Sequence, residues 1–233
     1  MTPDGSGSST DSAPIASDGS PISLFAQFPA GRDLQPILDY AAPEASILEL
    51  GCGAGRLLNP LVKLGFRATG VDIDRNMLAH VDGDVRTIAC DIIHCDLGER
   101  FDVVVLASFL INSSVEDEPR LFLQACRRHV ADDGCVLIQT TSLAWAQQLA
   151  SGQEWSTNGY RTIVLSAALL GKRLSAKFRY EKQGSVWTHS WNGILWEAPD
   201  LCELAASVGL YAPSPEGLSE DWCCLLPTVD GSR

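Results

Sequence analysis

The sequence predicts an α/β protein with a mostly parallel sheet, helices on both of its faces, and an antiparallel β cap inserted after the fifth strand. From Ser46 to Gln139, short apolar runs alternate with helix-like segments, which is typical of a parallel sheet with crossover helices. After Gln139 this rhythm stops, and consecutive strand-like runs between about 161 and 196 indicate an antiparallel insertion.

The individual elements follow from the spacing of the apolar residues. The run Phe101–Leu106 consists largely of branched apolar residues, as in strands that are covered on both faces. Parallel strands are expected over 47–50, 67–71, 85–90, 101–106 and 135–139, and helices over 57–64, 75–81 and 119–130. The cap strands are expected over 161–166, 174–180 and 186–196, followed by a helix over 199–208 and a last strand over 222–226.

Length and composition bound the organisation of the chain. Its 233 residues suit one domain, which we expect over 22–228 with the cap at about 161–196. The polar segment 1–21 is expected to be a disordered tail, and 229–233 a flexible C-terminus. No apolar run is long enough to span a bilayer and no secretion signal is apparent, so we expect a cytoplasmic protein. The net charge of −12 argues against nucleic-acid or membrane partners.

The eight cysteines lie mostly within apolar stretches and form no CxxC pair. We therefore expect reduced, buried thiols. Cys90, His94 and Cys95 are the one group whose chemistry would suit a metal, but zinc sites normally use tighter, paired spacing. No metal is expected.

A glycine-rich loop follows the first predicted strand. Glu49 lies near the end of that strand, and Gly51, Gly53 and Gly55 follow it before the next helix. Glycines allow a tight turn and a close approach of a ligand to the backbone. A dinucleotide loop would follow the pattern G-x-G-x-x-G, whereas here the third glycine comes one residue early and Arg56 takes the next position.

Two carboxylates follow the next two strands. Asp72 ends the second strand, where its oxygens can accept hydrogen bonds from both ribose hydroxyls. Asp91 ends the third, where it can reach the edge of an adenine, although it can also simply cap a turn. Together with the glycine loop, these residues predict a site for a nucleoside.

The stretches 47–56, 69–78, 101–106 and 133–138 resemble the motifs of class I S-adenosylmethionine-dependent methyltransferases. The resemblance implies a Rossmann-like, seven-stranded sheet whose last strand is antiparallel. It also implies that the glycine loop contacts the methionine part of the cofactor, that Asp72 binds the ribose, and that the adenine is bound by the residues after the second and third strands. The cofactor residues expected on this basis are Glu49, Gly51, Cys52, Gly53, Gly55, Arg56, Asp72, Ile73, Met77, Asp91, Ile92 and Ser108.

Departures from subfamily motifs narrow the function. Ser108-Phe109-Leu110-Ile111 replaces the signature of nucleic-acid amino methyltransferases, and no acidic cluster like that of metal-dependent catechol methyltransferases is present. We therefore expect metal-independent, direct methyl transfer to a small molecule. The alternatives are a protein that binds S-adenosylmethionine without transferring methyl groups, and a nucleotide-linked oxidoreductase.

The substrate residues are expected around the cap. Trp187, His189 and Trp191 alternate along one predicted strand and therefore share a face. If that face looks into the crevice, the indoles can line a pocket and His189 can act as a base. The other interpretation is that they only pack the cap onto the sheet. Phe109 and Asn112, which follow the fourth strand, are further candidates for contact with the substrate.

Overall fold

The computed structural model describes residues 14–213 and 221–228, and its central feature is a seven-stranded sheet in the order β10-β11-β5-β4-β1-β2-β3. The strands from β1 to β5 are parallel, whereas β11 runs antiparallel to β5 and β10 antiparallel to β11. The expected mostly parallel sheet with an antiparallel last strand is therefore confirmed. The seven strands are β1 (Ser46–Leu50), β2 (Arg67–Asp72), β3 (Arg86–Ala89), β4 (Phe101–Leu106), β5 (Val130–Gln139), β10 (Leu210–Tyr211) and β11 (Trp222–Pro227).

Helices cover both faces of this sheet because alternate strand residues point to opposite sides. On one face, Leu48 and Leu50 pack with α5 (Glu118–His129) and α7 (Ala198–Ala206). On the other, Ile47 packs with α2 (Gln35–Tyr40) and α3 (Leu58–Lys63). The shorter helices are α1 (Ile22–Phe25), η1 (Gly31–Leu34), α4 (Arg75–Leu78), η2 (Leu110–Asn112) and α6 (Leu143–Gln148). None of the described helices is long and apolar enough to cross a membrane.

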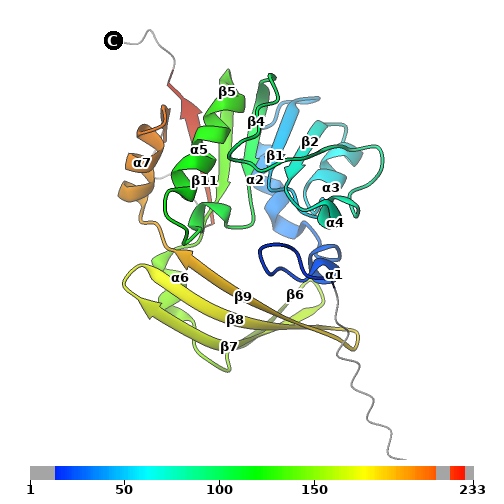
Figure 1. Ribbon diagram of the computed structural model, residues 1–233, viewed down its shortest axis with the longest axis vertical. Helices are drawn as coiled ribbons and strands as arrows, with labels where there is room; N and C mark the ends of the chain where they lie inside the picture. Colours follow the sequence, from blue (N-terminus) through cyan, green and yellow to red (C-terminus); the bar gives the residue numbers. More distant parts are fainter. Residues whose placement is uncertain (1–13, 214–220, 229–233) are drawn as a thin grey trace, which may run out of the picture.

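The cap is an antiparallel sheet in the order β6-β7-β8-β9, and it lies across the carboxyl ends of the parallel strands (Figure 1). Its strands are β6 (Glu154–Thr157), β7 (Tyr160–Leu170), β8 (Arg173–Lys182) and β9 (Ser185–Ile194). The cap therefore begins at β6, before the predicted start at about 161. The side-chain amide of Asn112 donates a 2.8 Å hydrogen bond to the carbonyl of Ile194, which ties β9 to the body.

The N-terminal strap, which we define as residues 14–28, differs from the expected disordered tail over 14–21. Ala16 and Ser20 are buried, and Ala16 packs with Ile22, Ala54 and Met77. The backbone N–H of Ser17 also donates a 3.1 Å hydrogen bond to Asp74. A few well-placed contacts thus dock a segment whose composition is mostly polar. The remainder of the predicted tail, 1–13, and the predicted C-terminal segment 229–233 lie outside the described residues.

Candidate functional site

The glycine loop lies at the carboxyl end of β1, where three glycines adopt positive φ. The φ values are 75° at Gly51, 53° at Gly53 and 79° at Gly55, a region that side chains rarely tolerate. A Cβ on Gly51 would come within 2.3 Å of a Leu110 methyl, so this glycine packs against η2, which follows β4. A Cβ on Gly53 would meet no atom within 4 Å, so this part of the loop borders open space.

Glu49 is the most unusual polar residue of the site. Its side chain is buried, and its Oε2 has no hydrogen-bond partner. Burial raises the pKa of Glu49 to about 8; nearby Arg56 opposes this shift and Asp72 adds to it. A buried carboxylate oxygen without a partner is costly, so the position suits a ligand that brings a cation or a hydrogen-bond donor.

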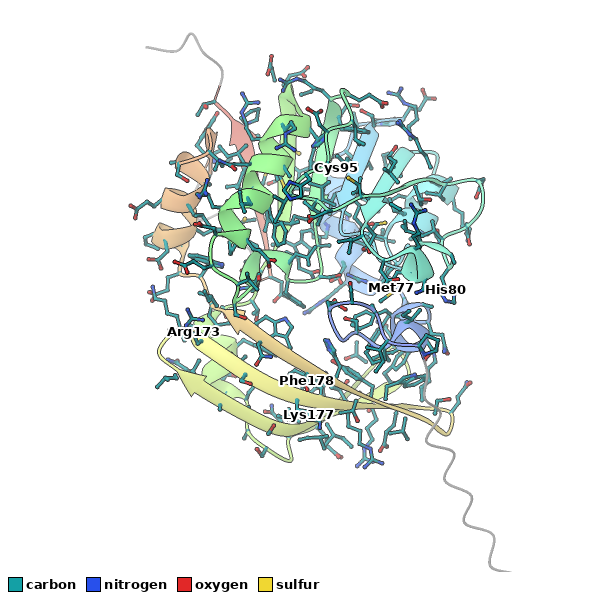
Figure 2. The ribbon with its side chains drawn as sticks, viewed as in Figure 1. Met77, His80, Cys95, Arg173, Lys177 and Phe178 are labelled. Atoms are coloured by element: carbon teal, nitrogen blue, oxygen red, sulfur yellow. The ribbon has the colours of Figure 1, made fainter. Side chains whose placement is uncertain are left out.

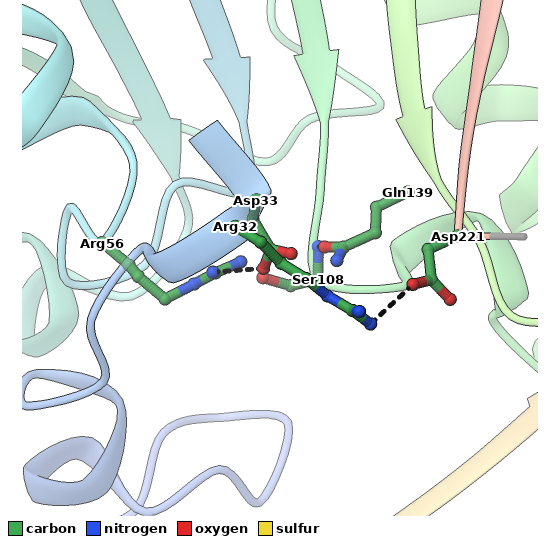
Figure 3. A network of polar contacts seen from close by, with 6 residues as sticks. All are labelled: Arg32, Asp33, Arg56, Ser108, Gln139 and Asp221. Atoms are coloured by element: carbon green, nitrogen blue, oxygen red, sulfur yellow. Dashed lines mark hydrogen bonds and ion pairs between the residues drawn. The ribbon is translucent and has the colours of Figure 1, made fainter. Parts of the chain in front are cut away.

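Arg56 does not supply that partner. Its guanidinium donates a 2.6 Å hydrogen bond to Asp33 of η1, and both side chains are largely buried. Arg32, the neighbour of Asp33 in η1, points the other way and pairs with Asp221 over 2.9 Å (Figure 3). No sequence motif points to Asp33, because its partner lies 23 residues away along the chain.

Asp72 lies at the end of β2, next to the glycine loop. Its carboxylate accepts hydrogen bonds from the backbone N–H groups of Gly53 (2.7 Å) and Asp74 (2.8 Å). Burial raises the pKa of Asp72, while these two hydrogen bonds oppose the shift. Asp72 thus organises the loop and is also placed where the sequence predicts a ribose.

The two apolar residues expected to flank an adenine differ in exposure. Ile73 is 60% exposed beside Asp72, whereas Met77 is buried under the strap. An exposed isoleucine at the carboxyl edge of the sheet offers an apolar surface to a flat ligand. After β3, Asp91 caps its own turn by accepting a 2.9 Å hydrogen bond from the N–H of Ile93, and Ile92 is buried next to Gly51.

The turn after β4 has an unusual backbone. Ser108 and Phe109 are consecutive non-glycine residues with φ of 56° and 60°. The N–H of Ser108 donates a 2.9 Å hydrogen bond to the buried Gln139 side chain at the end of β5 (Figure 3). Ser108 is exposed and Phe109 is half-buried, so both remain candidates for ligand contact.

Asn112, expected to contact the substrate, is fully buried. Its Oδ1 accepts hydrogen bonds from the N–H of Thr141 and the hydroxyl of Thr140, while its amide bonds Ile194. These contacts join the ends of β4 and β5 to the cap. They make Asn112 a structural anchor, which is a correction to the sequence-based assignment.

The inner face of the cap carries Trp187, His189 and Trp191, which are half-buried while their neighbours along β9 are exposed. Their expected common face is therefore confirmed. Two of the three contact the strap. Trp187 donates a 2.9 Å hydrogen bond to the hydroxyl of Ser23, and the His189 ring makes an edge contact with the Phe25 ring, with ring centroids 5.5 Å apart. Trp191 instead lies over Gly193, where an added Cβ would also come within 2.7 Å of the Asn112 carbonyl.

Asp18 of the strap connects this face to the cofactor side. Burial lowers the pKa of His189, and the Asp18 carboxylate acts in the opposite direction. The same carboxylate adds to the raised pKa of Asp72. His189, Asp18 and Asp72 thus belong to one electrostatic neighbourhood.

Two further observations concern metal binding and a cavity in the cap. No group of three or more metal-ligating side chains occurs among residues 14–213 and 221–228, and all eight cysteines are free thiols. A cavity of about 520 Å³ lies at the hairpin end of the cap, lined by Arg161, Arg179 and Lys182 among others. It contains none of the glycine-loop residues, so it is separate from the site described above.

Known proteins are similar to this chain in sequence and in fold. Residues 25–189 match the family described as "Methyltransferase domain". The ubiquinone biosynthesis O-methyltransferase of Bradyrhizobium diazoefficiens is 31% identical over 106 residues, which are 42% of this chain and 41% of that enzyme. The chain thus matches less than half the length of this relative.

Solved structures are similar in fold over most of the chain. The sugar N-methyltransferase KedS8 from Streptoalloteichus has a TM-score of 0.62 and 20% identity, covering 85% of this chain and 83% of the other. The S-adenosylmethionine-bound amino pentose methyltransferase CalS10 from Micromonospora echinaspora has a TM-score of 0.60 and 20% identity, covering 89% of this chain and 90% of the other. With the family match spanning most of the sequence, the chain belongs to the class I S-adenosylmethionine-dependent methyltransferases.

Proposed function

We propose that this protein transfers the methyl group of S-adenosylmethionine to a small molecule held between the glycine loop and the inner face of the cap. The observation that carries the proposal is the buried Glu49 carboxylate, whose Oε2 lacks a partner at the base of the loop. The cofactor's ammonium group has the charge that this oxygen requires. The pairing of an unpartnered acid with an open glycine loop fits the methionine end of the cofactor.

The other cofactor contacts follow from position. We assign the ribose to Asp72, one face of the adenine to the exposed Ile73, and the adenine edge to Asp91 with Ile92. When bound, the cofactor supplies an electrophilic methyl group on a positively charged sulfur. The task of the protein is then to align the acceptor atom with that methyl group and to keep competing water away.

The charges around the crevice favour a neutral or cationic substrate. Arg32 and Arg56 are each paired with an aspartate, whereas Asp18 and Glu49 have no basic partner among the described ion pairs. An amine or a hydroxyl would be accommodated more readily than a phosphate or carboxylate. Phe109, Trp191 and the Trp187–His189 face supply the apolar and aromatic surface of such a pocket.

His189 is proposed as the acceptor of the substrate proton. Its lowered pKa keeps the imidazole neutral near pH 7, the form that can accept a proton from a hydroxyl or an ammonium group. Since the ring already contacts Phe25, this role requires the strap to leave one nitrogen accessible to the substrate.

Two measurements test the proposal. Calorimetry should show binding of adenosylhomocysteine to the wild type and a loss of at least tenfold in Glu49→Leu, with a nicotinamide dinucleotide as the negative control. Incubation of metabolite pools with methyl-labelled cofactor should then label a small amine or alcohol. Tight cofactor binding without a labelled product from any pool would instead favour a binding protein, and preferential binding of the dinucleotide an oxidoreductase.

A further inference from the structure

The carboxyl edge of the central sheet has two halves. In the strand order β5-β4-β1-β2-β3, the glycine loop, Asp72 and Asp91 follow β1, β2 and β3. The cofactor assigned to these residues therefore takes one half of the edge. Ser108 follows β4 and Gln139 ends β5, so both belong to the other half, which is left for the molecule that receives the methyl group.

The carboxamide of Gln139 has a fixed orientation, and the residue is only 4% exposed. A backbone N–H group can donate but not accept, so the 2.9 Å hydrogen bond from the Ser108 N–H must end on the carboxamide oxygen, Oε1. Rotating the amide by 180° would set two donors against each other. The amide nitrogen, Nε2, is thereby held on the side away from the Ser108 N–H.

This nitrogen has two N–H donors and no hydrogen-bond partner among residues 14–213 and 221–228. Glu49 Oε2 is the one side-chain nitrogen or oxygen of the described residues that is both fully shielded and unpartnered, so Gln139 Nε2 borders open space. A side chain that is buried except for unused donors is suited to bind an oxygen of a ligand, because buried polar groups are normally paired.

The turn that Gln139 holds is itself strained. Ser108 and Phe109 are consecutive non-glycine residues with φ of 56° and 60°, which is energetically costly. Such strain occurs mainly at ligand and active sites. Figure 3 shows Ser108 and Gln139 side by side at the ends of β4 and β5. The carboxamide thus fixes the turn through its oxygen and leaves its nitrogen for another partner.

The inner face of the cap bounds this space from the other side. Figure 2 shows Phe178 of β8 pointing to the body and its neighbour Lys177 pointing away from it. His189 is paired with Phe178 in the cap sheet and therefore lies on the inner face. Only β4 separates β1 from β5, so about 10 Å of sheet lies between the glycine loop and Gln139. A small molecule can span that distance.

We propose that Gln139 binds the substrate and determines specificity, with Nε2 donating a hydrogen bond to an uncharged oxygen of the methyl acceptor. This inference rests on the proposed methyl transfer and specifies its substrate. The acceptor is a small amine or alcohol that carries a hydroxyl, ether or carbonyl oxygen besides the atom that is methylated. An uncharged oxygen fits because Arg32 and Arg56 are already paired with aspartates.

Transfer of label from methyl-labelled S-adenosylmethionine to metabolite pools tests the donor. Gln139→Glu keeps an oxygen for the Ser108 N–H but replaces Nε2 by a second oxygen, which is ionised at pH 8. At a low pool concentration it should transfer label at least tenfold more slowly than the wild type, mainly through a higher KM. Its affinity for adenosylhomocysteine should stay within twofold. Gln148→Glu, at an exposed position on α6, adds the same charge and should match the wild type.

A substitution without charge and a modified acceptor separate binding from a structural role. Gln139→Met should be as slow as Gln139→Glu, and thermal melting shows whether each variant is folded. The deoxy analogue of the labelled acceptor, which lacks the additional oxygen, should react at least tenfold more slowly with the wild type. Removing that oxygen should slow Gln139→Met by less than threefold, whereas a purely structural role would leave both proteins equally sensitive to the oxygen.

Three results would overturn the proposal: a labelled product with no oxygen besides the methylated atom, equal rates of the wild type with the two acceptors, or Gln139→Glu as fast as the wild type. The first two need no variant. A wild type that does not bind adenosylhomocysteine would instead contradict the proposed function. A wild type that binds it but labels no compound would contradict methyl transfer and this inference together.

Discussion

The indole N–H of Trp187, on the cap, lies 2.9 Å from the hydroxyl oxygen of Ser23, in α1. The two residues are 164 positions apart in the sequence, and their hydrogen bond joins the strap to the inner face of the cap. Phe28 strengthens the same junction by stacking on Tyr160 with ring centroids 4.5 Å apart. The cap is therefore held from two sides, by the strap at one end and by Asn112 near the other.

Trp187→Phe should remove this hydrogen bond and retain most of the ring packing. We expect the free energy of unfolding to fall by about 0.5–1.5 kcal/mol, the usual net contribution of one hydrogen bond. Urea denaturation of Trp187→Phe, Ser23→Ala and the double variant measures the coupling. Trp145→Phe, at a 40% exposed indole on α6, is the control. Fully additive losses in the double variant would show that the two side chains do not interact.

Gly53→Val should abolish binding of adenosylhomocysteine, because its side chain would project into the space that borders the loop. Gly98→Val is a matched control: its φ is 63° and no atom lies within 4 Å of a Cβ built there. Both variants should lose roughly 1–2 kcal/mol of stability from the left-handed backbone. Calorimetry should distinguish the two variants, because only Gly98→Val should bind adenosylhomocysteine normally. Normal binding by Gly53→Val would exclude the loop as a contact surface.

Asp72→Ala should weaken adenosylhomocysteine binding by about 1.5–3 kcal/mol, the scale for a hydrogen bond to a charged group. Since Asp72 also accepts hydrogen bonds from the Gly53 and Asp74 backbones, stability should fall as well. Asp96→Ala is a control, because Asp96 accepts a similar 3.0 Å hydrogen bond from the Gly98 backbone in a different loop. Unchanged affinity in a folded Asp72 variant would remove this residue from the site.

The Glu49 carboxyl should make cofactor binding depend on pH. With a pKa of about 8 in the free protein, it is mostly protonated at pH 7. A bound ammonium favours the ionised form, so binding should release a proton and affinity should rise between about pH 6 and 8, by at most tenfold per unit. Calorimetry in buffers of different ionisation enthalpy measures this release, and Glu49→Gln should abolish it.

The same group should affect the stability of the free protein. The pKa of Glu49 is higher in the folded chain than in the unfolded one. Its favourable contribution to the free energy of unfolding is therefore present at low pH and is lost as the pH rises from about 4.5 through 8. Above this window Glu49→Gln should melt at a higher temperature than the wild type, and near pH 4 the difference should vanish. A constant difference across the range would contradict the raised pKa.

His189→Ala should lower kcat about 100-fold or more if the imidazole takes the substrate proton, with little change in cofactor affinity. His189→Asn keeps a polar side chain of similar size but cannot act as a base near pH 7, so it should be equally slow. If the ring only shapes the pocket, His189→Ala should mainly raise KM. His189→Asn should then raise KM less than His189→Ala does.

Local patterns predicted the central sheet because its strands are apolar on both faces. β4 begins and ends where the branched run Phe101–Leu106 does. β5 begins at Val130, five residues before the predicted start, because its polar first half looks like a loop and pairs with Phe101 only across a bulge. β6 was not predicted, although Asn158-Gly159, with φ of 54° and 79°, is a strong hairpin signal.

The site was predictable to the extent that its residues lie in one motif. The glycine loop and Asp72 come together because parallel strands end at the same edge. The pairing of Asp33 with Arg56, the docking of the strap and the burial of Asn112 depend on segments distant in the sequence. No local pattern contains such information, which is why the sequence predicts a substrate contact at Asn112 and a disordered tail over residues 14–21.

The docked strap has a kinetic consequence. Ala16 and Ile22 rest on Ala54 and Met77, and Ser17 is bonded to Asp74, so the segment closes over the side of the site where the nucleoside is expected. We expect these contacts to open before spent cofactor leaves. A rapid-mixing assay should show one fast turnover per active site followed by a slower steady rate, and weakening the strap with Ile22→Ala should raise that steady rate.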